Sequence, residues 1–308
     1  MSLLGALPAR FRRERVLIVG CGDVGQRAAQ ALGGGRRVRL LALTSSAERA
    51  PALRAQGITP LPGNLDDARS LRRLAGLATR VLHLAPPPST ELEDWRLDPR
   101  TRALTRALVQ RVPPAAMVYG STTGVYGDCE GRWVSEATPA SPKTPRAWRR
   151  VDAEAAVHWL GRASGVRTTV LRIPGIYAPD RANGTPRERL QRGTPVLRAE
   201  DDVYTNHIHA DDLARACVLA LWRGRAQRNI NVVDDTQLKM GDYFDLAADL
   251  YGLPRPPRIA RDAAGDQLPL VLLSFMSESR RLDNQRLKNE LGLRLRYPTV
   301  AQGLRGPA

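Results

Sequence analysis

A glycine-rich turn near the amino end constrains the fold of this chain more than any other feature. The turn is Gly20-Cys21-Gly22-Asp23-Val24-Gly25, and it follows Val16–Val19, an all-apolar run typical of a strand buried on both faces. Apolar residues then recur at helical spacing as far as a glycine stop at 33–35. A strand, a glycine turn and a helix in this order predict a dinucleotide-binding unit.

Each residue of the turn has a predicted part. Gly20 permits the tight turn, Gly22 lets the backbone approach a pyrophosphate, and Gly25 allows the helix to pack closely on the strand. Asp23 and Val24 open the helix, whose free N–H groups and dipole favour an anion. We therefore expect the whole turn to bind the cofactor. The alternative is a glycine turn that holds no ligand.

The rest of the chain supports an α/β fold. Strands are predicted near 39–43, 59–62, 81–85, 115–119 and 168–173. Helices are predicted over 47–56, about 98–112, 211–222 and 240–251, and one is centred on 153–159. This alternation implies parallel strands with right-handed crossovers, and hence a Rossmann-type doubly wound parallel sheet with a smaller C-terminal α/β substrate domain. We predict a dinucleotide-binding domain over 1–178, to which 207–226 return, and a substrate-binding domain over 179–206 and 227–308.

Composition bears on partners and location. The net charge is +16, but the chain has only three lysines, and its arginines are spread along the whole length, so we do not expect a nucleic-acid partner. No apolar run is long enough to span a membrane, and the basic residues follow the first apolar patch, which is the wrong order for a secretory signal. The three scattered cysteines predict a reducing compartment and no metal site. We expect a cytoplasmic protein.

The end of the second predicted strand bears on cofactor preference. A site that prefers NAD should carry an acidic residue there for the ribose hydroxyl. This chain instead has Thr44, Ser45 and, close behind, Arg49. Hydroxyls and a guanidinium suit a 2′-phosphate, so NADP(H) is favoured over NAD(H). The alternative is that Thr44 and Ser45 only cap the next helix.

Six segments in order resemble the extended short-chain dehydrogenase/reductases, the NAD-dependent epimerase/dehydratase family. Beyond the glycine turn they are Asn64-Leu65-Asp66, Val81-Leu82-His83-Leu84-Ala85, Ser121–Gly127, Leu171–Pro179 and Ile208–Ala214, and the tail Asp283–Gly292 is similar to the closing helix of the family. The resemblance covers nearly the whole chain. It implies that Asn64, Leu65, Ala85, Pro86 and Pro174 also line the cofactor site.

One departure from the family concerns its active site, which uses Tyr-x-x-x-Lys to move a proton and to hold the nicotinamide ribose. When the chain is aligned on Glu154, Arg146 and Arg150 stand at the tyrosine and lysine positions, and no tyrosine of the chain has a lysine four residues later. The chain is thus similar to the atypical, YeeZ-like proteins of the family. Arg150 can hold the ribose but cannot shuttle a proton.

Hydride chemistry would then need another proton donor. Thr122 matches the serine that orients the substrate in the family, and Tyr126 and Tyr177 are the candidate donors. The alternative is that these two tyrosines are packing residues or stack on the cofactor. His209 is expected to be structural. We expect an NAD(P)-dependent oxidoreductase or epimerase that acts on a small polar or nucleotide-linked carbonyl or carbinol substrate. By analogy with relatives, a homodimer is the expected assembly. The alternative is a non-catalytic NADP(H)-binding redox sensor or regulatory protein.

Overall fold

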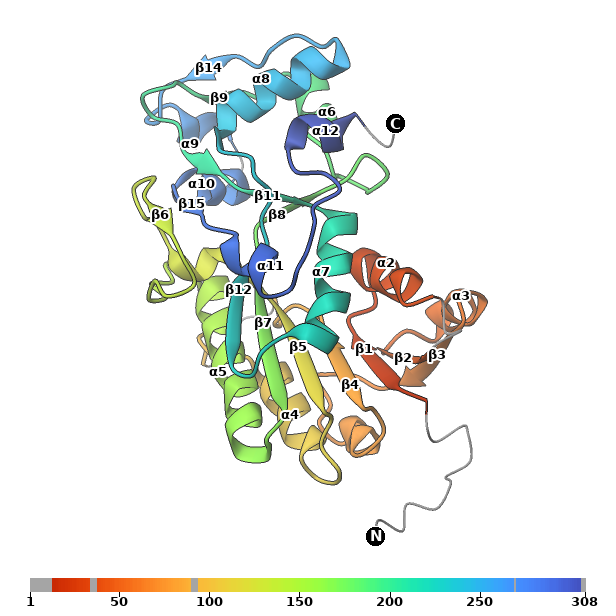
Figure 1. Ribbon diagram of the computed structural model, residues 1–308. Helices are drawn as coiled ribbons and strands as arrows, with labels where there is room; N and C mark the ends of the chain where they lie inside the picture. The colour runs from red at the N-terminus through yellow and green to blue at the C-terminus, as the bar shows by residue number, and fades with distance from the viewer. Residues whose placement is uncertain (1–12, 34–37, 90–93, 269, 306–308) are drawn as a thin grey trace. The chain divides into compact units, whose positions relative to one another are not determined.

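The computed structural model describes residues 13–33, 38–89, 94–268 and 270–305. A seven-stranded sheet with the order β12-β7-β5-β4-β1-β2-β3 forms its framework (Figure 1). Its strands are β1 (Arg15–Val19), β2 (Arg39–Thr44), β3 (Ile58–Pro62), β4 (Arg80–His83), β5 (Ala116–Thr122), β7 (Arg167–Ile173) and β12 (Arg228–Asn231). The pairs β1–β2, β1–β4, β2–β3 and β4–β5 are parallel. The predicted α/β class and doubly wound parallel sheet are confirmed.

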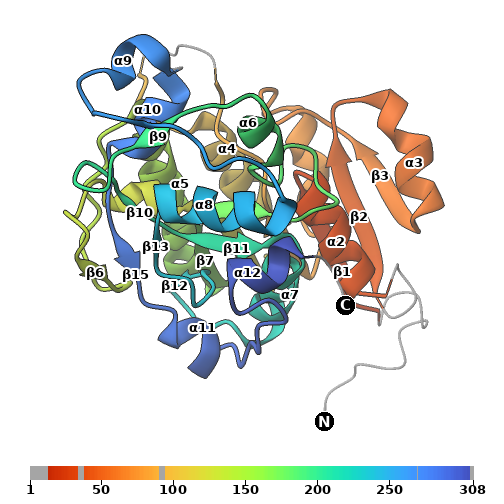
Figure 2. The same cartoon turned by 90° about the horizontal axis from the view of Figure 1, so that it is seen from above.

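Helices connect these strands, and each of them except the short one at 70–74 overlaps a predicted helix. They are α2 (Asp23–Ala31), η1 (Ala47–Arg49), α3 (Ala50–Ala55), η2 (Ser70–Leu74), α4 (Pro99–Leu108), α5 (Pro145–Ser164) and α7 (Ala210–Arg223). Figures 1 and 2 both show α2 alongside β1, and α3 beside β3. Gly33 follows α2 with a φ of +83°, and the rest of the predicted stop, 34–35, lies outside the described residues.

Alternating side chains of β1 face opposite sides of the sheet. Leu17 and Val19 belong to a core cluster that includes Leu104 of α4 and Val157 of α5. Ile18 faces the other way, because a Cβ built on Gly25 of α2 would lie 3.3 Å from its Cγ2. Helices therefore cover both faces of β1, which explains its unbroken apolar sequence.

The remaining elements are mostly short. They are η3 (Thr123–Tyr126), β6 (Trp133–Val134), β8 (Gly175–Tyr177), α6 (Arg187–Gln191), β9 (Val196–Leu197), β10 (Tyr204–Thr205), β11 (His207–His209), β13 (Leu238–Lys239), α8 (Met240–Tyr251), β14 (Arg258–Ile259), α9 (Ala264–Gln267), α10 (Leu270–Met276), β15 (Arg281–Leu282), α11 (Gln285–Asn289) and α12 (Val300–Leu304). Many of them share a second core cluster around Phe244 and Tyr243 of α8.

Two compact units divide the chain. The first comprises Met1–Ser121, Arg149–Leu171 and Cys217–Arg228, and the second comprises Thr122–Trp148, Arg172–Ala216 and Asn229–Ala308. The predicted division into nucleotide-binding and substrate domains is a functional one and stays a prediction. Cys21, Cys129 and Cys217 are buried free thiols. Over the described residues, no helix is long and apolar enough to cross a membrane.

Candidate functional site

Gly20 begins the glycine turn at the carboxyl end of β1, in the first unit. Its φ is +87°, and a Cβ built on it would lie 2.3 Å from the backbone nitrogen of Ala85. The Gly22 N–H donates to the Gly20 carbonyl at 2.9 Å, which closes the turn. Only glycine fits this position without moving the backbone that follows β4.

Gly22 and Gly25 fit their predicted parts as well. A Cβ on Gly22 would meet nothing within 4 Å, so the backbone there is open to a ligand. A Cβ on Gly25 would lie 3.0 Å from the Gly20 carbonyl oxygen, so a side chain would push α2 off the strand. No side chain caps the amino end of α2, where Asp23 and Val24 stand. A helix amino end without a side-chain cap, next to open backbone at Gly22, fits a pyrophosphate.

The residues after β2 lie beside this turn. Arg49 donates from Nη2 to the Cys21 carbonyl at 2.5 Å, which fixes its guanidinium next to the glycine turn. Thr44 Oγ1 accepts from the Ser46 N–H at 3.2 Å, so its hydroxyl caps the local turn, and Ser45 is exposed. The structure therefore places the Arg49 cation beside the glycine turn and leaves the Ser45 side chain exposed after β2.

The loop after β3 carries Asn64 and Leu65. Asn64 Oδ1 accepts from the Asp66 N–H at 3.0 Å, and Leu65 packs against the core of the first unit. The Asp66 carboxylate binds Arg100, the second residue of α4, through two hydrogen bonds of 2.6 Å each. These bonds hold the pKa of Asp66 below its ordinary value. Sequence reasoning missed Arg100, because its partner lies 34 residues away.

The segment after β4 contributes the other wall of the turn. The Ala85 N–H donates to the Val19 carbonyl at 3.1 Å, which keeps Ala85 against Gly20. Pro86 is exposed, whereas Pro87 and Pro88 are buried. Arg149 of α5 donates to the Pro88 carbonyl. The segment of three prolines is thus held at both ends, and its restricted backbone makes it a rigid border of the glycine turn.

A buried polar chain underlies β4. His83 Nε2 lies 2.9 Å from the Thr101 hydroxyl, which donates to the Asp98 carboxylate at 2.7 Å. Burial, with the nearby Arg150 charge, lowers the pKa of His83 to about 3, and burial raises the pKa of Asp98. His83 is therefore a neutral structural residue whose ring is held by a local hydrogen bond.

Arg150, at the position of the family lysine, lies on α5 in the same unit. Its Nη1 donates to the Tyr119 hydroxyl at 3.0 Å and to the Gly120 carbonyl at 2.7 Å. One turn further along α5, Glu154 accepts from the Ser121 hydroxyl at 2.6 Å. No site role was expected for Tyr119 or Ser121, although both lie on β5, the strand that ends at Thr122. Tyr119 is fully buried, so in this structure its phenol supports Arg150.

Two further predicted site residues, Thr122 and Pro174, belong to the second unit. Thr122 ends β5 and accepts from the Gly124 N–H at 3.2 Å, and it is half-buried. Pro174 stands between β7 and β8 and is also half-buried. Their roles toward a substrate or cofactor remain predictions.

Tyr126 and Tyr177 are buried in the second unit, at 1% and 2% exposure. Tyr126 donates to Asn231 Oδ1 at 2.7 Å, and Tyr177 donates to the Thr299 carbonyl at 3.4 Å. Burial raises the pKa of Tyr177 above its ordinary value. In this structure both phenols are hydrogen-bonded packing groups, and proton transfer by either one stays a prediction.

His209 and Asp212 have structural roles. The ring of His209 stacks on Tyr297 with centroids 3.7 Å apart, and its Nδ1 accepts from the Asp211 N–H at 3.2 Å. Asp212 is buried and accepts from the backbone N–H groups of Arg296 and Tyr297, each at 2.9 Å. This carboxylate thereby fixes the C-terminal segment.

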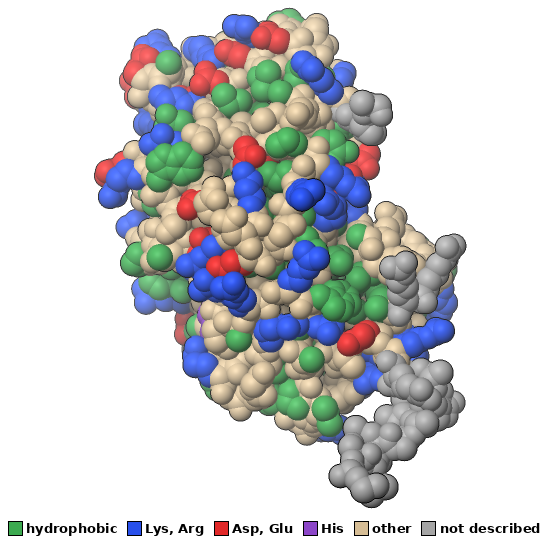
Figure 3. Space-filling view, viewed as in Figure 1, with side chains coloured by type: hydrophobic (Ala, Val, Ile, Leu, Met, Phe, Trp, Pro, Cys, Tyr) green, Lys and Arg blue, Asp and Glu red, His purple; other side chains and the backbone are tan. Residues whose placement is uncertain are grey.

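The surface charge is mixed. Figure 3 shows Lys and Arg side chains spread over the face drawn, with Asp and Glu side chains among them. Within the described residues, no three His, Cys, Asp or Glu side chains gather as metal ligands.

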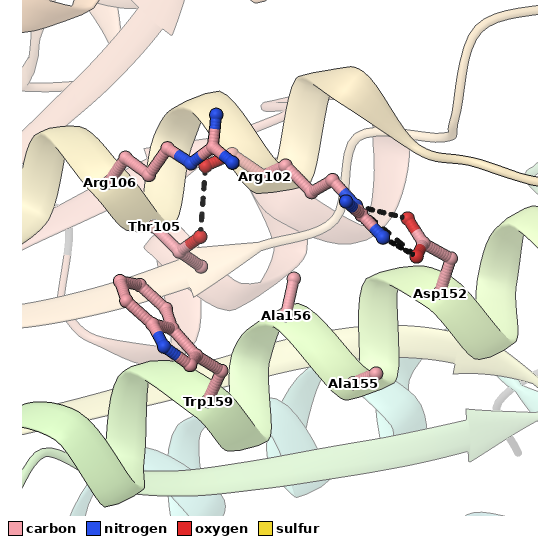
Figure 4. A pocket seen from close by; sticks show the side chains of 7 residues that line it. All are labelled: Arg102, Thr105, Arg106, Asp152, Ala155, Ala156 and Trp159. Atoms are coloured by element: carbon pink, nitrogen blue, oxygen red, sulfur yellow. Dashed lines mark hydrogen bonds and ion pairs between the residues drawn. The ribbon is translucent and has the colours of Figure 1, made fainter.

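A pocket of about 360 Å³ lies between α4 and α5 (Figure 4). Arg102 and Asp152 pair across it, while Trp159 lines it with 43% of its surface exposed. The pocket contains none of the predicted site residues. It marks a partly apolar groove on two helices that cover one face of the sheet.

Comparison with known proteins identifies a family and several similar structures. Residues 16–233 match the model of the NAD dependent epimerase/dehydratase family. A conserved protein of unknown function from Silicibacter pomeroyi is 29% identical, with a TM-score of 0.77 over 95% of this chain and 97% of that one. No curated protein matches the sequence.

Two solved enzymes share the fold at lower identity. One is UDP-glucose 4-epimerase from Thermotoga maritima with UDP-glucose, 17% identical, with a TM-score of 0.76 over 94% of this chain and 96% of that one. The other is dTDP-glucose 4,6-dehydratase from Streptomyces venezuelae with NAD, 21% identical, with a TM-score of 0.73 over 94% of each chain.

Proposed function

Because the chain belongs to the NAD-dependent epimerase/dehydratase family, we propose that it binds NADP(H) and is an oxidoreductase or epimerase. Its substrate would be a small polar or nucleotide-linked molecule with a carbonyl or carbinol carbon. The bound cofactor would supply or accept a hydride at that carbon. The observation that carries the proposal is the open backbone at Gly22 beside the uncapped amino end of α2.

The preference for NADP(H) rests on Arg49. Its guanidinium is held 2.5 Å from the Cys21 carbonyl, and Ser45, which follows β2, has an exposed side chain. A planar guanidinium and a hydroxyl suit a 2′-phosphate, whereas a site for an unphosphorylated ribose usually has a carboxylate there. Arg49 would bind the phosphate and orient the adenosine ribose.

The protein would orient the substrate through Thr122, whose hydroxyl accepts a backbone N–H and so keeps a defined direction. Arg150 would hold the nicotinamide ribose by charge and hydrogen bonds, while its contacts with Tyr119 and Gly120 keep it in place. Tyr126 or Tyr177 would donate the proton. Either phenol would first have to exchange its present hydrogen bond for one to the substrate.

Binding and turnover test this proposal separately. Purified protein is titrated with NADPH, NADP⁺, NADH and NAD⁺, and then mixed with aldehydes, ketones and nucleotide sugars while nicotinamide absorbance is followed. Nucleotide-sugar products are also separated by chromatography, since an epimerase shows no net absorbance change. We expect tighter binding of NADPH than of NADH, and turnover that falls in Thr122→Val.

The burial of both candidate phenols favours a second function, a non-catalytic NADP(H)-binding redox sensor or regulatory protein. A sensor needs the glycine turn and Arg49 but no proton donor. Tight binding that distinguishes NADPH from NADP⁺, with no product from any substrate of the panel, would support the sensor. Turnover that is lost in Tyr126→Phe or Tyr177→Phe would support the enzyme.

A homodimer is proposed as the assembly, through the groove between α4 and α5. Its support is the exposed indole of Trp159 beside the 360 Å³ pocket, because aromatic side chains of this kind are enriched at interfaces. Sedimentation velocity would give the mass of the native protein. We expect a dimer that dissociates in Trp159→Glu and persists in Trp133→Glu. Trp133 is the matched control because 51% of its surface is exposed.

A further inference from the structure

Three residues form a bridge at the carboxyl edge of the sheet, which we name the Arg100 bridge. Arg100 donates from Nε and Nη2 to the two carboxylate oxygens of Asp66, at 2.6 Å each. Its third nitrogen, Nη1, lies 3.4 Å from the carbonyl oxygen of Pro86. The guanidinium therefore joins the loop after β3 to the loop after β4.

The strand order shows what this bridge crosses. In the sheet, β1 and β2 lie between β4 and β3. The glycine turn begins where β1 ends, and Thr44 and Ser45 stand where β2 ends. A bridge from the end of β3 to the end of β4 therefore spans the same two strand ends that carry the predicted cofactor contacts.

Both ends of the bridge are fixed by further hydrogen bonds. Asn64 Oδ1 accepts from the Asp66 N–H at 3.0 Å, and the Asn64 N–H donates to the Ser70 hydroxyl at 3.0 Å. Arg100 stands in the first turn of α4, where the buried Asp98 accepts from the Thr101 N–H at 3.1 Å. The guanidinium plane is thus held between two braced segments.

A held guanidinium offers a flat cationic face. The side chains of Arg100 and Asp66 remain 25% and 48% exposed, so a ligand can reach them. Arginine stacks well on aromatic rings, and its planar fork keeps its orientation while paired to a carboxylate. Purine rings match such a face in size and in charge distribution.

We propose that Arg100 is a positioning residue for the adenosine half of the dinucleotide, with its guanidinium stacked on the adenine ring. This inference rests on the proposed binding of NADP(H). The Arg100 bridge would close the adenosine end of the site and slow the departure of the cofactor. The nicotinamide half would bind independently of it.

Ligand fragments separate the two halves of the site. Wild type, Arg100→Gln, Arg100→Lys and Asp66→Asn are titrated with NADPH, adenosine 2′,5′-bisphosphate and reduced nicotinamide mononucleotide, and NADPH dissociation is followed by stopped-flow fluorescence. Arg255→Gln is the matched control, since Arg255 binds Asp249 through the same two-bond geometry, at 3.0 and 2.8 Å. Thermal unfolding should change little in any variant, because exposed ion pairs stabilise a fold weakly.

We expect Arg100→Gln and Asp66→Asn to weaken NADPH and the bisphosphate by about five- to ten-fold, mainly through faster dissociation. Arg100→Lys should show an intermediate loss, and the mononucleotide and Arg255→Gln should show none. Unchanged bisphosphate affinity in Arg100→Gln, or an equal loss for the mononucleotide, overturns the role of Arg100 alone. Failure of the wild type to bind NADPH overturns the proposed function together with this inference.

Discussion

The Arg49 guanidinium donates to the Cys21 carbonyl, 28 residues away, at 2.5 Å. This bond ties the turn after β2 to the glycine turn and holds a cation beside it, which in the proposed NADP(H) site would bind the 2′-phosphate. Arg49→Gln removes that charge. We expect the Kd for NADPH to rise about ten-fold or more while the Kd for NADH changes little, since charge-assisted bonds to phosphate are the stronger kind.

Fluorescence titration with both reduced cofactors checks this prediction. Arg54→Gln is a suitable control, because Arg54 is exposed on the neighbouring helix α3. An Arg49→Gln protein that keeps its preference for NADPH would show that another residue selects the cofactor.

Gly20→Ala is predicted to destabilise the first unit. The φ of +87° is unfavourable for alanine, and the new Cβ would lie 2.3 Å from the Ala85 nitrogen. Together, backbone strain and the forced movement should lower the free energy of unfolding by about 2–4 kcal/mol. Urea unfolding followed by circular dichroism measures the loss. Gly33→Ala shares a positive φ but meets no atom within 4 Å, so it should lose less.

Tyr126→Phe separates packing from chemistry. The variant removes the 2.7 Å bond to Asn231 Oδ1 and leaves a buried acceptor without this partner. A loss of stability of about 1–3 kcal/mol is expected from that change alone. Chemical denaturation gives this value, and a stability equal to that of the wild type would contradict the structural role of the hydroxyl.

Asp234 predicts a pH dependence of stability in the second unit. Burial is the largest cause that raises its pKa to about 7, and the negative charges of Asp235 and Asp212 add to it, while hydrogen bonds from Thr236 oppose it. A pKa higher in the folded than in the unfolded chain means that the folded chain binds the proton more tightly. The contribution of Asp234 to the free energy of unfolding is therefore complete below about pH 4 and is lost as the pH rises to about 7.

Asp234→Asn should remove this part of the pH dependence, because the amide stays neutral and its oxygen can still accept from the Thr236 N–H. Across that window the wild type should lose up to about 1.4 kcal/mol per pH unit relative to the variant. Melting curves of both proteins between pH 4 and 8 test this. Parallel curves would mean that Asp234 ionises at its ordinary pKa.

Local patterns predicted the elements well where they were unambiguous. The helix predicted over 240–251 is α8 with the same bounds, because Gly252 ends it in the left-handed conformation at a φ of +62°. The helix predicted over 47–56 is divided into η1 and α3, since Pro51 lacks an N–H and stands in the first turn of α3. The short helices α9, α10 and α12 were not predicted.

The site was predictable only where its parts are consecutive in the chain. The glycine turn is one run of residues, so its geometry follows from its own sequence. By contrast, Asp66 and Arg100 are 34 residues apart, and Tyr126 and Asn231 are 105 apart. Such pairs depend on which strands become neighbours, which no local pattern encodes. The hydrogen-bond partners of both candidate phenols were hidden for the same reason.

Calorimetric titration of NADPH into the wild type and Gly22→Ala tests the binding of a dinucleotide by the glycine turn most directly. An alanine Cβ at position 22 meets no protein atom within 4 Å, and the φ of −83° suits alanine, so this variant should fold and melt like the wild type. The account predicts heat of binding for the wild type and a loss of at least about ten-fold in affinity for Gly22→Ala. Equal affinity in the two proteins, or no binding by the wild type, would contradict it.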